Sequence, residues 1–230
     1  MYKRKHNSNP NNIPIAGAFD FEAAFPSVIH DWIWLVLHHR KMPPDYIRVF
    51  QSLYKHAIAT FEHNGDIHVL IRLLSGVLQG CPASAFLFNN AIDPFLASFD
   101  KALRSRHAGI VRACADDIGI VLKQLKHLKL VQPIFNDFKS HAGLALKPPK
   151  CVLVPLCVFS QEVHVQVCNW VAHHLPDFNV KPLAKLLVFF IGPQAGTKMW
   201  EGPLTKYKDR INDIKRGSAS IALNCHTYNT

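Results

Sequence analysis

The sequence predicts an α+β domain in which helices back one face of an antiparallel sheet. Short apolar runs of strand length alternate with longer stretches that carry apolar residues at helical spacing. Two positions carry the signals of hairpins, Asn64-Gly65 and the acidic pair Asp116-Asp117. Of the 230 residues, 49% are hydrophobic, so a sizeable core can be buried. Hairpin strands separated by helices favour the α+β class.

The first half of the chain contains five expected elements. In order, they are a strand at residues 15–21, helices at 27–40 and 45–55, and strands at 57–63 and 67–73. Pro43-Pro44 separates the two helices, because proline lacks the backbone N–H that a helix interior needs. Asn64-Gly65 joins the two strands, because both residues tolerate the positive φ of a two-residue turn.

The second half begins with a glycine-containing loop and a helix that extends to about Arg104. Two strands then meet at Asp116-Asp117. The remaining expected elements are a helix at 125–141, strands at 152–155 and 162–167, an apolar segment at 186–191 and a helix at 203–216. Gly143 follows the first of these helices as its stop signal, since glycine readily adopts the left-handed conformation that ends a helix.

The adjacent carboxylates Asp116-Asp117 are the most informative feature for function. Apolar residues flank them on both sides, so two like charges stand next to each other where two strands meet. Such a pair raises the pKa of one carboxyl group or recruits a metal ion that lets both stay ionised. The alternative is a solvated acidic turn, and the dipeptide alone does not decide between the two.

A third carboxylate, Asp20, also ends an apolar run. The strand at residues 15–21 and the acidic hairpin would bring three carboxylates together if their strands were neighbours. Hard divalent ions such as Mg²⁺ prefer oxygen ligands, and substrate phosphates and waters complete their coordination. Two such ions form the usual clamp for in-line displacement at phosphorus. The chemistry that this pattern indicates is phosphoryl or nucleotidyl transfer.

The loop before the helix that ends near Arg104 contains Gly76 and Gly80. Glycines at these positions would let the backbone approach a ligand closely, and Gln79 offers both a donor and an acceptor. Ser84 is the expected N-cap of the helix. The alternative is an ordinary loop and helix start.

The charge of the chain favours a polyanionic partner. The formal net charge is +10 and the isoelectric point is about 9.4. Lysines and arginines that neutralise phosphates gain affinity by counterion release. Any single basic cluster could instead be a solubilising surface. No apolar stretch approaches the roughly 20 residues that cross a bilayer, so no membrane partner is expected.

In their order along the chain, these segments resemble the palm domain of a reverse transcriptase, an RNA-directed DNA polymerase, of the non-LTR retrotransposon type. Asp20 with Ala24-Phe25 is similar to the first catalytic segment, Gln79-Gly80 with Pro82 and Ser84 to the second, and residues 115–117 to the third. Downstream, residues 138–151 resemble the fourth segment, and residues 189–192 with 200–207 resemble the primer grip and the start of the thumb.

The resemblance implies a role for each site residue. Asp20, Asp116 and Asp117 would be the ligands of two Mg²⁺ ions, for which Mn²⁺ could substitute, with Asp117 the least direct of the three. Phe25 would be a steric gate that blocks the 2′-hydroxyl of a ribonucleotide. The remaining nucleotide-binding residues would be Gln79, Gly80 and Lys150. The alternatives are a core aromatic at Phe25 and a solvent-facing lysine at Lys150.

The resemblance also implies a domain plan and partners. Residues 1–12 would be a disordered basic tail, 13–180 the palm, and 181–230 a primer-grip-like segment and the start of the thumb. The partners would be an RNA template, a DNA primer and deoxynucleoside triphosphates, in an intracellular setting, the nucleus or the cytoplasm. Few residues precede Asp20, so the expectation is a palm whose fingers, or an endonuclease segment, lie upstream and outside this chain.

Two departures from the pattern of the family leave the carboxylates intact. Cys114 stands where many relatives have an aromatic residue, and Pro26 stands where they often have an aspartate. The expected function is RNA-directed DNA polymerisation by nucleotidyl transfer to a primer 3′-hydroxyl. The alternative is a catalytically inactive retroelement remnant, or a palm module that only binds nucleic acid.

Overall fold

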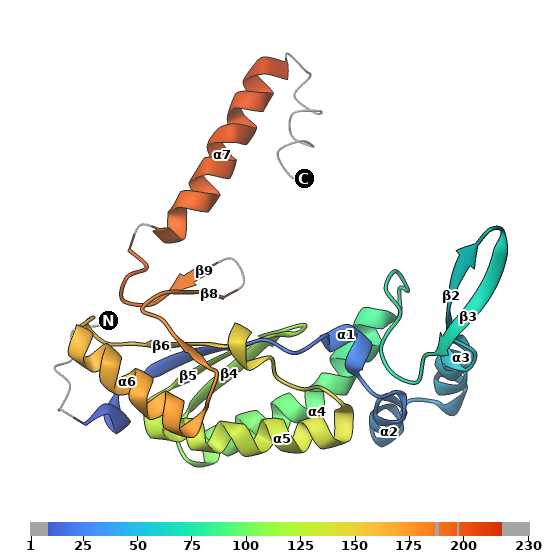
Figure 1. Ribbon diagram of the computed structural model, residues 1–230, viewed down its shortest axis with the longest axis horizontal. Coiled ribbons are helices and arrows are strands. Elements are labelled where there is room, and N and C mark those ends of the chain that lie inside the picture. The colour runs from blue at the N-terminus through green and yellow to red at the C-terminus, as the bar shows by residue number, and fades with distance from the viewer. Residues whose placement is uncertain (1–8, 187–188, 197, 218–230) are drawn as a thin grey trace.

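The computed structural model describes residues 9–186, 189–196 and 198–217. A five-stranded sheet with the strand order β4-β5-β1-β6-β7 forms its centre. The strands are β1 (Ile15–Phe19), β4 (Gly109–Cys114), β5 (Asp117–Leu122), β6 (Val152–Pro155) and β7 (Asn179–Val180). Neighbouring strands are antiparallel except β6 and β7, which are parallel. Helices lie along one face of the sheet (Figure 1), which confirms the α+β prediction.

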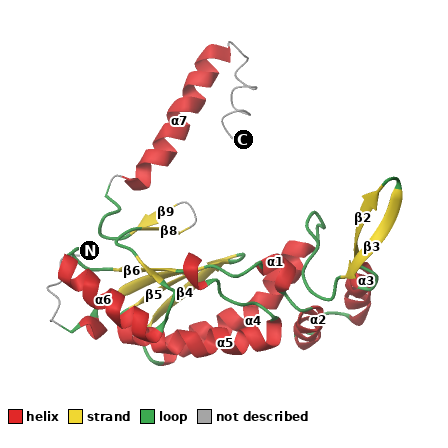
Figure 2. Cartoon of the chain, viewed as in Figure 1, coloured by secondary structure: helices red, strands yellow, loops and turns green. Residues whose placement is uncertain are grey.

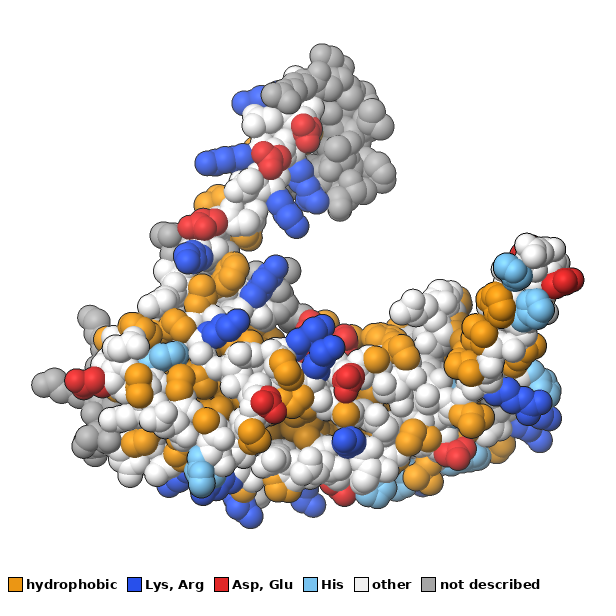
Figure 3. Space-filling model, viewed as in Figure 1, with side chains coloured by type: hydrophobic (Ala, Val, Ile, Leu, Met, Phe, Trp, Pro, Cys, Tyr) orange, Lys and Arg blue, Asp and Glu red, His pale blue; other side chains and the backbone are white. Residues whose placement is uncertain are grey.

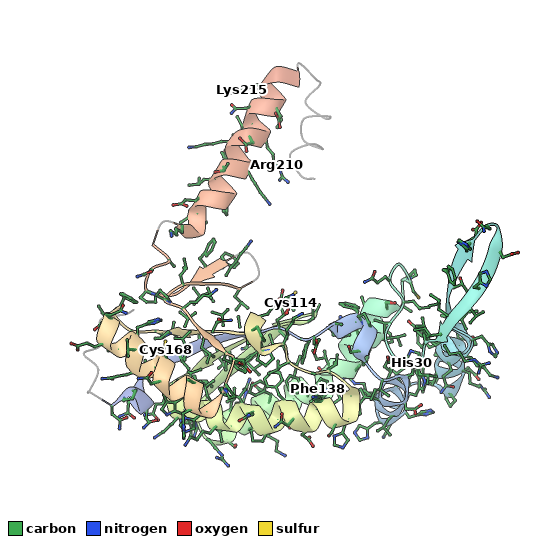
Figure 4. All side chains as sticks on the ribbon, in the orientation of Figure 1. His30, Cys114, Phe138, Cys168, Arg210 and Lys215 are labelled. Carbon is green, nitrogen blue, oxygen red and sulfur yellow. The ribbon has the colours of Figure 1, made fainter. Side chains whose placement is uncertain are left out.

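Three helices enclose the core against this face of the sheet: α4 (Ser84–Ser105), α5 (Val131–Ala142) and α6 (Gln161–His174). Phe95 of α4 stacks on Phe138 of α5 with ring centroids 4.5 Å apart. Phe135 of α5 lies 5.0 Å from the ring of Phe19 on β1. Figure 4 shows Phe138 between α5 and the sheet. These aromatic contacts join the helices to the strand that leads to Asp20.

The opposite face of the sheet carries small side chains and is covered only in part. Side chains alternate along a strand, so Ala16 and Ala18 of β1 point away from the helices. A hairpin of β8 (Ala184–Leu186) and β9 (Phe189–Ile191) lies over this face. A Cβ atom on Gly119 would come within 2.6 Å of Leu186, so glycine is what lets the hairpin sit close. Beyond β8 and β9 this face is open, and α7 (Lys198–Gly217) rises from it (Figure 1).

The segment between Phe21 and the loop at Gly76 forms the far end of the molecule. It contains α1 (Ala24–Ser27), α2 (His30–His39), α3 (Pro44–Tyr54) and a separate hairpin of β2 (Ile58–His63) and β3 (Asp66–Arg72). Trp32 of α2 donates a hydrogen bond to the carbonyl of Ala91 (2.8 Å), which fastens α2 to α4. Figure 2 shows the β2–β3 hairpin projecting away from the sheet.

Several predicted boundaries differ from the structure. The strand at 15–21 ends at Phe19, although Phe21 still forms one bridge to Leu146. The helix at 27–40 is two helices, α1 and α2, because Val28 and Ile29 are extended. The helix at 125–141 begins as the 3₁₀ helix η2 (Leu125–Leu130) before α5. Gly143 ends α5 with φ 78°, as predicted.

The prediction of a strand at 162–167 is wrong. Val163, Val165 and Val167 alternate with polar residues, which is the pattern of a half-buried strand, but α6 is a helix. Val163, Val167 and Val171 are four residues apart, so one helical face presents all three to the core. Burial of this stripe decides the conformation, since β-branched residues disfavour a helix only weakly.

The two ends of the chain also differ from the predictions. The predicted disordered tail reaches residue 12, but Pro10–Asn12 forms a 3₁₀ helix, η1, capped by Asn9; residues 1–8 lie outside the described residues. The helix at 203–216 begins five residues earlier, at Lys198, and Pro203 lies inside it. Within the apolar segment at 186–191, Leu186 ends β8 and residues 189–191 form β9, whereas residues 187–188 lie outside the described residues. Among the described helices, none is long and apolar enough to cross a membrane.

Candidate active site at the open end of β1 and β5

Two of the predicted site carboxylates lie opposite each other. β1 pairs with β5 in antiparallel register, with Phe19 opposite Ile118. The same register continued by one residue places Asp20 opposite Asp117. Asp117 is two residues before Gly119, whose missing Cβ would point to Leu186 on the open face. The two carboxylates therefore belong to the open face, away from the helices.

The third carboxylate, Asp116, lies in the turn between β4 and β5. Cys114 pairs with Asp117, so Ala115 and Asp116 form a two-residue connection. Ala115 has φ 52°, a left-handed conformation that costs an L-residue roughly 1–2 kcal/mol. Backbone strain of this kind clusters at functional sites, where the surrounding structure holds it in place. Cys114 is exposed beside this turn (Figure 4).

The pKa of Asp117 reports how the three carboxylates affect one another. Burial raises this pKa, and the negative charges of Asp116 and then Asp20 raise it further. The direction means that a negative charge on Asp117 is disfavoured by its surroundings. A bound cation would remove that cost, so the electrostatics of this end of the sheet suit a positively charged ligand.

Lys150 supplies a cation at this position from within the chain. Its Nζ atom lies 3.5 Å from Oδ2 of Asp20. The 3₁₀ helix η3 (Pro148–Lys150) carries the lysine, and the N–H of Lys147 donates to the carbonyl of Asp20 (2.9 Å). Oδ2 of Asp20 is shielded from solvent and accepts no hydrogen bond in the described structure. No local sequence pattern indicates this ion pair, because the partners are 130 residues apart.

The donor chemistry of this end fits a hard divalent cation. Carboxylate oxygens are the ligands that Mg²⁺ prefers, and the solvent-shielded Oδ2 of Asp20 has an unfilled acceptor position. Within the described ranges, however, no three His, Cys, Asp or Glu side chains are close enough together to hold one ion. The arrangement shown pairs Asp20 with Lys150, so the carboxylates fit by type and charge without being gathered around one point.

The loop that carries Gln79 and Gly80 is fastened to the segment that carries Phe25. The N–H of Val77 donates to the carbonyl of Phe25 (2.8 Å), and that of Gly76 donates to Val28 (2.7 Å). These bonds bring the first and second predicted motifs side by side. Gln79 and Gly80 are exposed, and nothing lies within 4 Å of a Cβ built on Gly80.

Gly76 does not have the predicted role of admitting a ligand. Its φ is 87°, and a Cβ atom there would lie 2.6 Å from the carbonyl oxygen of Pro26. The close approach that requires this glycine is therefore to the chain itself. Ser84 is likewise not the N-cap: it is the first residue of α4, Ala83 precedes it without a side-chain cap, and its hydroxyl donates to the carbonyl of Leu78.

The position of Phe25 is compatible with both interpretations that the sequence left open. It is half-buried and packs against the core, and its ring stacks on Phe88 with centroids 4.5 Å apart and planes 16° apart. Phe88 is fully buried, so the Phe25 ring is fixed in position. One part of the ring belongs to the core and the rest is accessible.

Two contacts that the sequence did not predict also hold the loop that carries Gln79 and Gly80. Nε2 of His30 lies 2.8 Å from the carbonyl oxygen of Gly76. The N–H of Leu78 donates to the hydroxyl of Tyr54 (3.4 Å). The loop is thus fastened to α1, α2 and α3, and no local sequence signal could have indicated these long-range pairs.

Comparison with known proteins identifies relatives over part of the chain. It is 30% identical over 125 residues to the uncharacterized 149 kDa protein of transposon TX1 from Xenopus laevis, which covers 50% of this chain and 9% of that protein. It is 26% identical over 138 residues to the retrovirus-related Pol polyprotein of the type-2 retrotransposable element R2DM from Drosophila melanogaster, which covers 59% of this chain and 13% of that protein. The chain thus spans about a tenth of the length of these relatives.

Among solved structures, apo telomerase from Candida tropicalis superposes with a TM-score of 0.62 at 12% identity, covering 89% of this chain and 36% of that chain. At this identity the likeness shows the fold, which is the right-hand polymerase fold with the α+β palm that the sequence predicted. The profile of the family described as "Reverse transcriptase (RNA-dependent DNA polymerase)" matches residues 3–186, the greater part of the sequence. That match includes every residue of the carboxylate end, and the chain accordingly belongs to the reverse transcriptase (RNA-dependent DNA polymerase) family.

Proposed function

We propose that this chain is the polymerising domain of a retroelement reverse transcriptase and extends a DNA primer on an RNA template. The reaction joins the primer 3′-oxygen to the α-phosphorus of a deoxynucleoside triphosphate and releases pyrophosphate. The observation that carries the proposal is that Asp20, Asp116 and Asp117 lie at the same end of β1 and β5, near enough for the first two to raise the pKa of Asp117. The raised pKa of Asp117 supports a cation at this end.

Asp20, Asp116 and Asp117 would hold two Mg²⁺ ions, with Mn²⁺ as a substitute and Asp117 as the least direct ligand. Reverse transcriptases generally use divalent metals, which activate the attacking hydroxyl and stabilise the leaving oxygen. The three carboxylates fix where these charges stand relative to the sheet. Lys150 must leave Asp20 for this role, and its Nζ would then offset negative charge on the leaving pyrophosphate.

The nucleotide pocket would be formed by the two fastened segments. Gln79 and Gly80 are exposed, and their loop is hydrogen-bonded to the segment that carries Phe25, which supports their contact with the incoming nucleotide. The ring of Phe25, fixed by Phe88, would exclude a 2′-hydroxyl and so select deoxynucleotides. The partial burial of Phe25 is compatible with this role, because a ring held in one position excludes a 2′-hydroxyl better than a mobile ring.

The shape of the molecule supports a duplex above the open face. Figure 3 shows a hollow between α7 and the β2–β3 hairpin, with Lys and Arg side chains, interspersed with Asp and Glu, at its base and along α7. Basic side chains in such a groove hold phosphates without reading sequence. The RNA template and DNA primer would lie there, with residues 13–180 as the palm and 181–230 as the primer-grip-like segment and start of the thumb.

Primer extension tests the proposal. The purified chain, a primed RNA template, deoxynucleotides and Mg²⁺ or Mn²⁺ should give extension that Asp116→Ala abolishes. A folded chain that binds the primed template at low salt but does not extend it, either alone or as part of a longer segment, would contradict the polymerase proposal and leave a nucleic-acid-binding module. Adding a longer segment of the parent polypeptide, which would supply fingers or an endonuclease region, tests whether activity needs more than this chain.

A further inference from the structure

A hollow of about 770 Å³ lies at the far end of the molecule, between α2, α3 and the end of β3. None of the candidate catalytic or nucleotide-binding residues lines it. Its walls include Trp34 and Asp31 of α2, Arg48, Tyr54 and Lys55 from α3 and its C-cap, and Arg72 of β3. Pockets of roughly 300–1,000 Å³ hold ligands of nucleotide size. The hollow is therefore large enough for a base together with its sugar.

The charge of this hollow is positive. Lys55 and Arg72 are exposed, and neither forms an ion pair in the described part of the chain. Arg48 forms an ion pair with Asp45, which lies outside the lining. Two unpaired cations, Lys55 and Arg72, and the ion-paired Arg48 thus line the hollow, against the single carboxylate of Asp31. Unpaired cations around a cavity favour a ligand that carries more than one negative charge.

Aromatic rings form the inner wall. The rings of Trp34 and Tyr54 are 6.0 Å apart at 64°, and His30 lies 5.1 Å from Tyr54. Tyr54 is buried, whereas Trp34 is half-buried and keeps part of its indole accessible. An accessible indole beside cations is the combination that binds single-stranded nucleic acid, since every base has a face that stacks. A paired duplex cannot offer a free base face.

The inner wall is also the wall that holds the Gln79 loop. His30 contacts the carbonyl of Gly76, and Tyr54 accepts a hydrogen bond from the N–H of Leu78. A ligand that orders His30 and Tyr54 would therefore order the loop on the other side. Figure 4 shows His30 at this end of the molecule, near the base of the β2–β3 hairpin.

We propose that this hollow binds an unpaired segment of RNA, as a second contact separate from the primed duplex at the carboxylates. A base would stack on Trp34, and its phosphates would contact Lys55 and Arg72. The proposal rests on the proposed function for the identity of the nucleic acid, because a chain that copies RNA must hold unpaired template.

Fluorescence anisotropy with a labelled, unstructured 12-nucleotide RNA tests this site. The variant Lys55→Gln/Arg72→Gln removes two charges from the hollow. The matched control Lys123→Gln/Lys126→Gln removes two exposed lysines from the far end of β5 and the segment after it. We expect the hollow variant to bind about tenfold more weakly, with a log–log salt slope smaller by about 1.4, the value for two phosphate contacts on a single strand. The control should lose about twofold or less.

Equal losses in the two variants would overturn the proposal, because they would report net charge alone. Preferential binding of an acidic peptide over the RNA would overturn it as well and would make the hollow a protein-docking site. Trp34→Phe keeps a ring in the core, and it should weaken RNA binding without changing the melting temperature. Primer extension reports separately: a chain that fails to extend but shows the selective loss of RNA affinity refutes the polymerase proposal and keeps this one.

Discussion

Two hairpins in this molecule have two-residue turns, and they are stabilised in different ways. The β2–β3 turn is Asn64-Gly65, with φ values of 53° and 88°, and the residues of its strands are almost all exposed. The β4–β5 turn is Ala115-Asp116, with φ 52° at an alanine, and β5 is buried in the sheet. Asparagine and glycine favour this turn geometry, whereas alanine opposes it.

The difference shows how much each turn must contribute to the stability of its hairpin. The β2–β3 hairpin has little packing, so its turn must supply its own stability. The β4–β5 hairpin is held by β1 through a continuous ladder from Ile15 to Phe19, so its turn can carry residues chosen for charge. A supported hairpin can bear strain and repulsion, and an unsupported one cannot.

The largest expected effect is on the primer-extension rate, and it should differ between Asp20 and Asp66, a carboxylate next to the β2–β3 turn. Asp20→Asn should lower the primer-extension rate by about 10³-fold, or ~4 kcal/mol in activation free energy, because it removes charge where the metal ions would bind. Asp66→Asn, next to the β2–β3 turn, should leave the rate within about twofold. Equal effects of the two substitutions would remove the distinction.

The proposed selection of deoxynucleotides by Phe25 can be tested by making its side chain smaller. Phe25→Val should reduce discrimination against ribonucleotides by about 10²-fold, because a smaller side chain admits the 2′-hydroxyl. The measurement is the ratio of kcat/KM for a deoxynucleotide and its ribonucleotide. Unchanged sugar discrimination in an active variant would make Phe25 a core aromatic only.

Lys150 and Lys147 form a matched pair of lysines, since both contact Asp20, the first through its side chain and the second through its backbone. Lys150→Met should slow extension about tenfold, since it removes the cation near the leaving group. Lys147→Met should have little effect, because its contact with Asp20 is through the backbone. Single-turnover rates compare the two, and a larger loss in Lys147→Met would contradict the assignment.

Substituting alanine for glycine in one turn, and glycine for alanine in the other, tests how each turn is stabilised. Gly65→Ala should destabilise its hairpin by about 1 kcal/mol, because alanine resists a φ of 88°. Hydrogen exchange should then accelerate in β2 and β3 only, with the global melting temperature unchanged. Ala115→Gly should relieve strain and raise the melting temperature slightly. A global loss of stability in Gly65→Ala would show that the hairpin is part of the core.

The smallest expected effect depends on pH. Burial and the neighbouring carboxylates raise the pKa of Asp117 in the folded chain, so the folded state binds the proton more tightly than the unfolded state. Stability is therefore lost as pH rises from the ordinary aspartate value through the raised value. Asp117→Asn should stabilise the chain at pH 7 by about 0.5 kcal/mol or less, because the group is largely exposed. The gain should vanish below the ordinary aspartate pKa. Thermal melts at pH 7 and at a pH below that value measure it, and a gain that persists in acid would contradict this explanation.

Local signals accounted for much of the fold. Asn64-Gly65, Gly143 and the strand Val152–Pro155 were located correctly, because turn chemistry and short apolar runs act over few residues. The segment of α6 was misassigned, since its valines fit both a strand and a helix until the core on one side is known. The local sequence alone therefore could not distinguish a strand from a helix in this segment.

In the candidate site, too, some features could be predicted from the sequence and others depend on tertiary packing. Asp20, Asp116 and Asp117 could be singled out because apolar residues surround them, and their meeting depends on strand neighbours that the resemblance indicated. Lys150 beside Asp20 and Tyr54 behind Leu78 depend on three-dimensional packing. The sequence predicts a ligand contact at Gly76, whereas the atoms closest to it belong to Pro26, a residue 50 positions earlier.

The ion pair between Lys150 and Asp20 has a consequence for how the protein is made. A solvent-shielded carboxylate oxygen without a counter-charge would destabilise the chain, and many metalloproteins fold only when the metal arrives. Here the counter-charge is part of the polypeptide. If the carboxylates hold metal ions as proposed, folding should therefore not require those ions, and the chain should reach its final shape in a medium depleted of divalent ions.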